Sequence, residues 1–439
     1  MNAIDVTAVP TATAAQPQAT QPQTKQQWAQ EQTHGRTNGH RASGRAGERA
    51  SGRAGERASE PPITRPRIAG LAMGDSDTTL TQRQVLDRLG LAGEEFAERI
   101  FAHSRIERRH LRLDDDFLGR TSQGRAVEVE DELLRHSVRA IDGLGLRRAV
   151  NGTHASTRNG RPHQGIDAAP GSTPSGRPRR ALDPARIGSV VSSSLYSLGL
   201  PTLAHRLAER YELDPTVDKY HVTGVGCASA VPLMRMAAGA LHQHPGRDSL
   251  IVAAESMSSI LMRGTAADPR AKTVGSAIFG DGCAAALLSG DPDAAGPAIV
   301  ASQVHQIGGT LDAVALSFAP DDSYLHLARE LPELAGAGLP GVVARFLHEH
   351  DVEHAAIDHW IVHPGGRRII ENIQHALALT DEQIELAWDT LAGHGNVGTP
   401  SIFYVLHETI ARRDPQPGEL GLAVTVGPGV TVGLMLLQW

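Results

Sequence analysis

Three features of the sequence predict an α/β protein with buried sheets. Strand-like runs alternate with segments of helical period, which is the order that α/β layers require. Several strands, such as 248–256 (DSLIVAAES), are apolar along most of their length, as in sheets that are covered on both faces. Aromatic residues make up only 4% of the chain whereas glycine and alanine are frequent, so helices and sheets are expected to pack closely.

The predicted elements follow one another from about residue 67 to the C-terminus. The segments of helical period are 94–106, 129–145, 200–213, the run after Cys227, 339–350 and 401–413. The segments expected to form strands are 187–194, 248–256, 277–291, 298–308, 358–366 and 420–439. The segment 277–291 begins with a glycine turn, and 420–439 contains one between two strands.

Two long segments are expected to lie outside these layers. Residues 1–66 are rich in Ala, Thr, Gln and Pro and then in Arg and Gly, and RASGRAGE occurs there twice in tandem. Such a composition cannot bury enough apolar surface to offset the chain entropy, which predicts a disordered tail. Residues 147–182 are similarly loose in composition and are interpreted as a flexible surface insertion.

Composition and charge exclude several classes of protein. A net charge of −7 gives no sign of general nucleic-acid binding. No apolar run approaches the roughly 20 residues needed to span a bilayer, so no membrane partner is expected. The start of the chain has no signal-peptide pattern, and the 2 cysteines cannot form a disulfide framework, so we expect a cytoplasmic protein.

Three short motifs place a polar side chain at the end of a predicted element, next to glycine. Cys227 follows Gly224 and Gly226 and opens a helix, where unpaired N–H groups and the helix dipole favour a thiolate. His363 ends an apolar strand before Pro-Gly-Gly, and Asn396 lies in GHGNVG before a helix. Taken singly, they are explained as a buried thiol, a histidine bonded to local backbone and a helix cap. Taken together, they predict a nucleophilic site.

Several segments resemble those of the type III polyketide synthases, the chalcone synthase-like family, from about residue 90 to the end of the chain. They are VTGVGCASAVPLMRMA, SAIFGDGCAAALLSGD, YLHLARELPEL, WIVHPGGRRIIENI, GHGNVGTPSIFYVL and VGPGVTVG. The resemblance implies a thiolase-like fold, five layers αβαβα with two related halves. We place the first half, with the cysteine, at 67–292 and the second, with the histidine and the asparagine, at 297–439. The tail at 1–66 has no counterpart in the family.

The resemblance also assigns the central roles in the chemistry. Cys227 is similar to the family's acyl-carrying nucleophile, His363 to its histidine and Asn396 to its asparagine. A cysteine beside a histidine can rest as thiolate and imidazolium. The histidine and the asparagine would hold the enolate oxygen that forms when malonyl-CoA loses carbon dioxide. The substrates would be CoA thioesters with no other cofactor, and no CxxC or HExxH motif suggests a metal.

The same resemblance indicates which residues line the cavity. Phe279 of FGDG looks like the gatekeeper phenylalanine between the CoA tunnel and the cavity. The second gatekeeper position, usually phenylalanine, falls on Leu325, so we expect a roomier passage and an aliphatic or bulky starter. Leu200 lies where the family places a methionine that reaches into the partner's cavity. The other candidates are a proline and glycines in turns near the site, namely Gly365, Gly366, Pro428 and Gly429.

Basic residues and the second cysteine complete the set of candidates. Arg99 and His103 are similar in position to basic residues that meet CoA phosphates in the family, with Arg367 and Arg368 as further candidates. Plain surface charge is the alternative for all four. Cys283, which opens the run CAAALL, is interpreted as a packed small hydrophobe.

The prediction is therefore a homodimeric acyltransferase, a type III polyketide synthase. It would condense malonyl-CoA repeatedly onto an acyl-CoA starter bound to Cys227 and cyclise the product to an aromatic ring or a pyrone. A single-condensation enzyme of the ketoacyl-synthase III type and a non-catalytic binding subunit of the same fold stay open as alternatives. A cysteine protease is disfavoured, because His363 and Asn396 lie in glycine turns of a buried-sheet pattern. The starter, the number of extensions and the mode of cyclisation do not follow from the sequence.

Overall fold

The computed structural model describes most of the chain from residue 65 onward. The described residues are 65–76, 78–145, 183–195, 197, 199–224, 226–261, 269–318 and 323–439. The expected insertion at 147–182 and all but the last two residues of the expected tail at 1–66 lie outside them.

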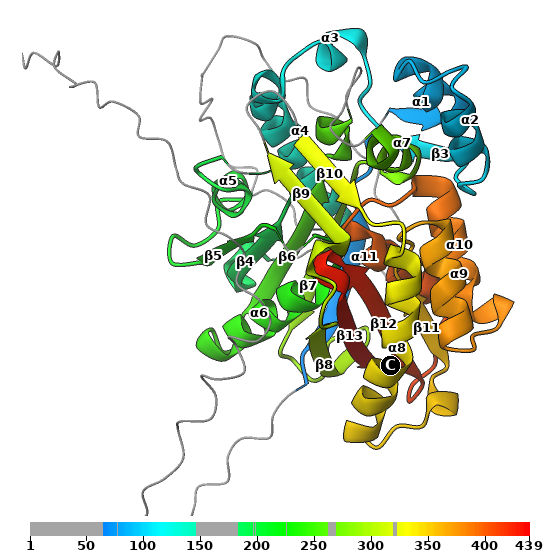
Figure 1. The fold of residues 1–439 in the computed structure, drawn as a ribbon. Helices are drawn as coiled ribbons and strands as arrows, with labels where there is room; N and C mark the ends of the chain where they lie inside the picture. Colours follow the sequence, from blue (N-terminus) through cyan, green and yellow to red (C-terminus); the bar gives the residue numbers. More distant parts are fainter. Residues whose placement is uncertain are drawn as a thin grey trace, which may run out of the picture. The chain divides into compact units, whose positions relative to one another are not determined.

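Nine strands of the described chain form one continuous sheet in the order β11-β12-β13-β8-β1-β7-β6-β4-β5 (Figure 1). Between β1 and β8 the ladder is reduced to the pair Arg67 and Ala298, which divides the strands into two groups. The strands are β1 (Arg67–Met73), β4 (Ile187–Ser193), β5 (Asp218–Val222), β6 (Asp248–Glu255), β7 (Gly282–Ser289), β8 (Ala298–Gln306), β11 (His359–Val362), β12 (Leu420–Gly427) and β13 (Thr431–Gln438).

The two groups repeat the same pattern of strand directions. In the first group β1 is antiparallel to β7, β7 is antiparallel to β6, and β6 is parallel to β4. In the second group β8, β13, β12 and β11 follow in the same way. This repeat confirms two related halves. We infer that the halves divide in the loop 290–297 between β7 and β8, where the sequence analysis placed the boundary.

A helical layer lies between the two strand groups. The helices α6 (Ala230–Gln243) and α11 (Pro400–Arg413) share one apolar core with side chains of both groups, for example Ile251 of β6 and Met435 of β13. Neighbouring side chains point the other way, because successive residues of a strand face opposite sides of a sheet. The sheets are thus covered on both faces.

The opposite faces of the two strand groups carry the outer helices (Figure 1). Leu250 and Val252 of β6 pack with α4 (Ser122–Gly143) and α5 (Leu203–Arg210). Leu434 and Leu436 of β13 pack with the helices of the second half. These are α8 (Leu331–Glu349), α9 (Arg367–Ala376) and α10 (Asp381–His394). The layers are therefore αβαβα, as predicted.

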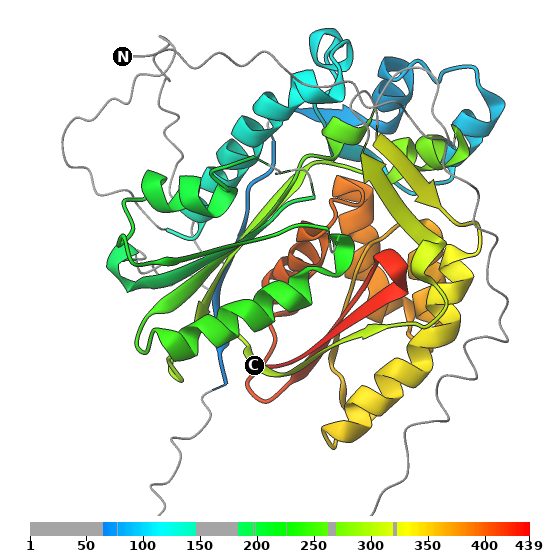
Figure 2. The same ribbon diagram turned by 60° about the vertical axis from the view of Figure 1, so that its left-hand side comes forward.

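Shorter elements surround the carboxyl ends of the first group. The helices α1 (Gln82–Arg88), α2 (Glu95–Ala102) and α7 (Pro269–Ile278) share a small core of their own. The hairpin of β9 (Val314–Phe318) and β10 (Ser323–Leu327) lies beside α7 (Figure 2). The remaining elements are α3 (Asp115–Leu118), β2 (Thr79–Thr81), β3 (Arg108–His110) and the 3₁₀ turns Pro184–Arg186, Gly226–Ala228, Met257–Ile260, Leu311–Ala313, His354–Ala356 and Pro428–Val430.

Several predicted elements differ from the structure. The helix expected at 339–350 begins eight residues earlier, at Leu331, and runs through Pro340. The segment 367–394, for which the sequence analysis proposed no helix, holds α9 and α10. Among the described residues, no helix is both long and apolar enough to cross a membrane.

The core of the second half offers a test of the packing. Phe346 of α8 is 1% exposed, so Phe346→Ala leaves a cavity and is expected to lower the free energy of unfolding by about 3–5 kcal/mol. Urea unfolding followed by circular dichroism measures the change. Leu311→Ala is the control, because Leu311 is 69% exposed and its loss should cost less than about 0.5 kcal/mol. Equal losses for both variants would contradict the assigned packing.

Candidate active site

Cys227 lies in a tight turn between β5 and α6. The 3₁₀ turn Gly226–Ala228 carries the cysteine, and α6 begins three residues later, which confirms the predicted helix start. Gly226 has a φ of +60°, and a Cβ there would lie 2.9 Å from Pro428 Cδ. Glycine is therefore needed both for the backbone conformation and for the close approach of the second half.

His363 follows directly on β11 and is buried. Its backbone N–H donates to the Val424 carbonyl at 2.9 Å, which extends the pairing of β11 with β12 by one residue. Neither ring nitrogen has a hydrogen-bond partner among the described residues. A Cβ on Gly365 would lie 3.1 Å from the ring carbon Cδ2, so this glycine leaves room for the imidazole.

Asn396 lies in the loop between α10 and α11 with its amide orientation fixed. Its Oδ1 accepts from the Gly398 N–H at 2.9 Å and lies 3.3 Å from Ser401 Oγ. Its Nδ2 donates to the Gly365 carbonyl at 3.2 Å. The donor end of the amide therefore points toward the turn that follows His363.

The structure brings Cys227, Asn396 and the turn that follows His363 together from three different loops. Cys227 Sγ lies 3.9 Å from Asn396 Oδ1 and 4.0 Å from its Nδ2. The bond from Nδ2 to Gly365 joins the same amide to the His363 turn. Cys227 and His363 are 136 positions apart in the chain, and His363 and Asn396 are 33 apart. Their loops nevertheless lie at one place, on either side of the seam between the two strand groups.

Burial opposes separate ionisation of the thiol and the imidazole. Although the residue is only half-buried, desolvation and then the charge of Glu255 raise the pKa of the Cys227 thiol to about 12. Desolvation lowers the pKa of His363 to about 4. Both shifts favour the neutral thiol and the neutral imidazole, so the thiolate–imidazolium pair considered in the sequence analysis is not the favoured resting state in this structure.

Glu255, at the end of β6, is a site residue that the sequence analysis missed. It is 2% exposed, and its carboxylate accepts from the Leu195 N–H at 2.8 Å. Thr399 Oγ1 lies 3.2 Å from this carboxylate and 3.0 Å from the Gly226 carbonyl oxygen, so it can donate its proton to either. Burial raises the pKa of Glu255 to about 7. A lone acid closing an apolar strand was the available signal in the sequence.

The FGDG segment is joined to the Asn396 loop by backbone hydrogen bonds. Phe279 and Asn396 form an isolated parallel bridge. Arg109, which is fully buried, donates to the Phe279 carbonyl at 2.7 Å and to the Ser276 carbonyl at 2.8 Å. The Asp281 carboxylate accepts from the backbone and the hydroxyl of Ser258 at 2.7 and 2.6 Å. The segment is therefore held from both sides.

The other predicted cavity residues are placed unevenly. Pro428 and Gly429 lie in the turn between β12 and β13, and Pro428 touches the cysteine turn. Leu200 is 89% exposed and thus lies on the surface of the single chain. Leu325 belongs to β10, but its side chain lies outside the described part. Cys283 is fully buried, as expected of a packed small residue.

The candidate CoA-binding residues lie together at the surface. Arg99 is in the last turn of α2, and His103 Nδ1 lies 2.7 Å from its carbonyl oxygen. Arg367, the first residue of α9, donates to the His103 carbonyl at 3.4 Å and pairs with Glu371 at 2.8 Å. The carboxyl end of α2 and the amino end of α9 thus lie side by side.

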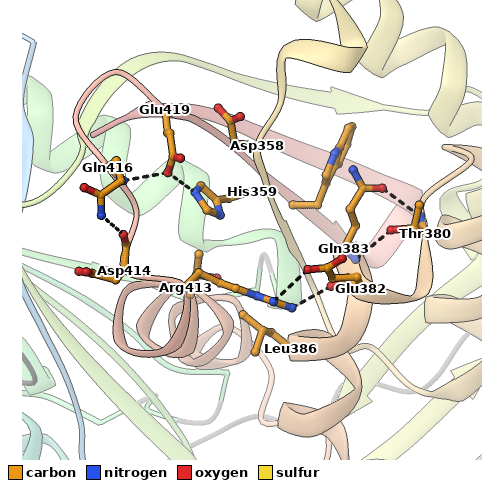
Figure 3. Close-up of a pocket in the computed structure, with 12 residues that line it drawn as sticks. Asp358, His359, Thr380, Glu382, Gln383, Leu386, Arg413, Asp414, Gln416 and Glu419 are labelled. Carbon is orange, nitrogen blue, oxygen red and sulfur yellow. Dashed lines mark hydrogen bonds and ion pairs between the residues drawn. The ribbon is translucent and has the colours of Figure 1, made fainter.

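A separate cavity of about 540 Å³ contains none of the predicted site residues (Figure 3). Its polar groups are bonded to one another, for example His359 to Glu419 at 2.8 Å and Arg413 to Glu382 at 3.5 Å. The lining residues are Asp358, His359, Trp360, Thr380, Glu382, Gln383, Leu386, Thr409, Arg413, Asp414, Gln416 and Glu419. We assign this cavity no part in the chemistry.

Comparison with known families identifies the chain. Residues 298–439 match the family described as chalcone and stilbene synthases, C-terminal domain. Residues 178–305 match the family described as FAE1/type III polyketide synthase-like protein. The chain belongs to the type III polyketide synthases. It is therefore an enzyme of the acyltransferase class, and its fold is thiolase-like.

Individual relatives of this polyketide synthase align over much of its length. The 3,5-dihydroxyphenylacetyl-CoA synthase of Amycolatopsis orientalis is 27% identical over 380 residues, which covers 85% of this chain and 93% of that protein. The 1,3,6,8-tetrahydroxynaphthalene synthase of Streptomyces peucetius subsp. caesius is 29% identical over 259 residues, 58% of this chain and 68% of the relative. The crystal structure of PKS-I from the brown alga Ectocarpus siliculosus superposes with a TM-score of 0.71 at 25% identity and covers 85% of this chain and 98% of that one.

The effect of the Glu255 charge on the Cys227 thiol predicts a pH dependence of thiol reactivity. Glu255 is ionised above a pKa of about 7 and then raises the pKa of Cys227, so Glu255→Gln should speed iodoacetamide labelling of Cys227 above pH 7. Below that pH both proteins carry a neutral side chain at 255, and their rates should converge. Intact-protein mass spectrometry over a pH series measures the rates. Identical profiles at pH 9 would contradict the assigned coupling.

Proposed function

We propose that this synthase builds its product on Cys227 by repeated decarboxylative condensation of malonyl-CoA onto an acyl-CoA starter, followed by ring closure to an aromatic or pyrone product. The observation that carries the proposal is that the Cys227 thiol meets the oriented Asn396 amide, which bonds to the turn after His363, whose ring nitrogens have no hydrogen-bond partner among the described residues. Names such as tetrahydroxynaphthalene synthase among the relatives support an aromatic product.

The first step is transfer of the starter to the cysteine. His363 accepts the thiol proton, and the thiolate attacks the thioester carbonyl, so that a new C–S bond forms and the CoA thiolate leaves. Because both groups are buried, the net-neutral proton transfer is the route by which the nucleophile forms. The CoA thiolate takes up the proton when it departs.

The second step is loss of carbon dioxide from malonyl-CoA. The electron pair of the breaking C–C bond moves onto the thioester, and its oxygen becomes an enolate oxygen. His363 Nε2–H and the second hydrogen of Asn396 Nδ2 would donate to it, and one such donor is worth about 3–4 kcal/mol. The amide is suited to this role because Gly398 and Ser401 engage its oxygen and fix its orientation, while its Nδ2 lies 4.0 Å from Cys227 Sγ. The enolate carbon then attacks the acyl-cysteine.

The surroundings of the site suggest how the substrates and a second chain are bound. The basic side chains of Arg99, His103 and Arg367, with Arg368 next in the chain, are proposed to meet the CoA phosphates. Leu200, at 89% exposed, is proposed to enter the cavity of a partner in a homodimer. A cytoplasmic location, expected from the sequence, fits CoA thioester substrates and remains part of the proposal.

Substitutions at the site test the assigned roles. Cys227→Ala should abolish both the acyl-enzyme mass and product formation, because Cys227 is the group that carries the growing acyl chain. Asn396→Ala should leave loading of Cys227 intact but lower malonyl-CoA decarboxylation by about 10²–10³-fold through loss of one oxyanion donor. Carbon dioxide release and intact-protein mass report the two steps separately. Unchanged decarboxylation in Asn396→Ala would refute the oxyanion role.

A panel of starters tests the width of the passage. Leu325 in place of the family's second phenylalanine is expected to admit aliphatic or bulky acyl-CoAs, and Leu325→Phe should shift the preference toward short ones. Products made with labelled malonyl-CoA are read by mass. Short starters outperforming every long one in the native enzyme would contradict the expectation, and products limited to one extension would indicate a single-condensation enzyme.

A further inference from the structure

Three potential metal ligands converge behind the FGDG segment. Asp75 Oδ2 lies 3.8 Å from His110 Nε2 and 3.7 Å from His394 Nδ1, and all three atoms lie within 4.8 Å of one another. These separations are too long for hydrogen bonds. The three side chains therefore face each other across a gap without bonding directly.

The spacing suits a bound metal ion. Zinc is held by imidazole nitrogen and carboxylate oxygen at about 2.0–2.2 Å, so ligand atoms of a tetrahedral site are about 3.4 Å apart. Shifts of a few tenths of an ångström would bring Asp75 Oδ2 to that distance from both nitrogens. Two histidines and one carboxylate form a ligand set that suits zinc and other divalent transition metals.

The far sides of the ligands are held by neighbouring groups, as in known metal sites. His110 Nδ1 lies 3.3 Å from Thr79 Oγ1, and a proton on Nδ1 leaves the lone pair of Nε2 directed at the gap. The Tyr404 hydroxyl donates to Asp75 Oδ1, which leaves Oδ2 available. The ring of His394 packs edge-on against Tyr404 at 4.9 Å, and its Nδ1 has no hydrogen-bond partner among the described residues.

We propose that Asp75, His110 and His394 bind one divalent transition-metal ion, with zinc as the leading candidate. The side chains of Asp75 and His394 are 28% and 30% exposed, so water can reach the fourth position. The ligands come from the loop after β1, from the end of β3 and from the end of α10. The ion therefore ties the first strand group to the second.

The proposed ion is structural and does not enter the condensation. His394 lies two residues before Asn396, and the His110 carbonyl accepts from the Asp281 N–H of FGDG at 2.8 Å. Binding of the ion would hold the backbone behind both Asn396 and Phe279. The sequence analysis expected no metal for the chemistry, and this proposal leaves that expectation unchanged.

Zinc retention by the full-length chain tests the proposal. The protein is stripped with a chelator, supplied with zinc sulfate and passed through a desalting column, and the zinc per chain is measured by mass spectrometry of the metal. One zinc per chain is expected for the native protein, and at least a tenfold loss of affinity for His110→Ala and His394→Ala. The control is His348→Ala/His375→Ala, which removes two exposed histidines on α8 and α9 and should retain the ion.

Two further measurements keep the outcome decisive. Thr79→Val removes only the outer partner of His110, and it should weaken zinc binding about 10–100-fold while leaving circular dichroism unchanged. Zinc K-edge absorption should show nitrogen and oxygen ligands with imidazole scattering. The proposal is overturned if the native chain retains no zinc, if folded ligand variants bind it as the native chain does, or if the ion is bound by sulfur.

Discussion

The pairing of the Asn396 loop with the end of α7 is the constraint on which the site depends. The Asn396 N–H donates to the Ile278 carbonyl at 2.8 Å, and the Gly280 N–H donates to the Asn396 carbonyl at 3.0 Å. These bonds hold a loop of the second strand group against a segment of the first. A Cβ on Gly280 would lie 2.5 Å from the His394 carbonyl oxygen, so only glycine allows this approach.

The turn that carries the nucleophile is packed just as closely against the other half. A Cβ on Gly427 would lie 2.7 Å from the Ala228 nitrogen, and one on Gly226 would meet Pro428. Backbone of the β12–β13 turn is thus pressed directly onto the turn of Cys227. The amide and the turn of the imidazole are joined within the second half, and contacts between the halves bring the thiol of the first half to them. This explains why residues so distant in sequence form one site.

The layers and the three central residues could be predicted from the sequence because their signals are local. An apolar strand that ends in His363 before Pro-Gly-Gly, or a cysteine that opens a helix after two glycines, can be recognised without tertiary contacts. Glu255 and Arg109 were missed because their importance arises from burial beside partners far away in the chain. The sequence analysis began α8 only at 339, whereas packing of Phe346 and its neighbours maintains a helix that starts at Leu331 and runs through Pro340.

The narrow junction of the two strand groups has a consequence for how enzyme activity can be lost. Only Arg67 and Ala298 pair across it, with flanking bonds from Ile68 to Pro297 and from Ile299 to Pro66. Little pairing between the strands themselves therefore resists a relative displacement of the halves, which are held together by the shared apolar layer of α6 and α11 and by the backbone bonds of the Asn396 loop. Catalytic competence is thus a property of the docked pair: a slight parting of the halves would separate sulfur from carboxamide while each half kept its own secondary structure.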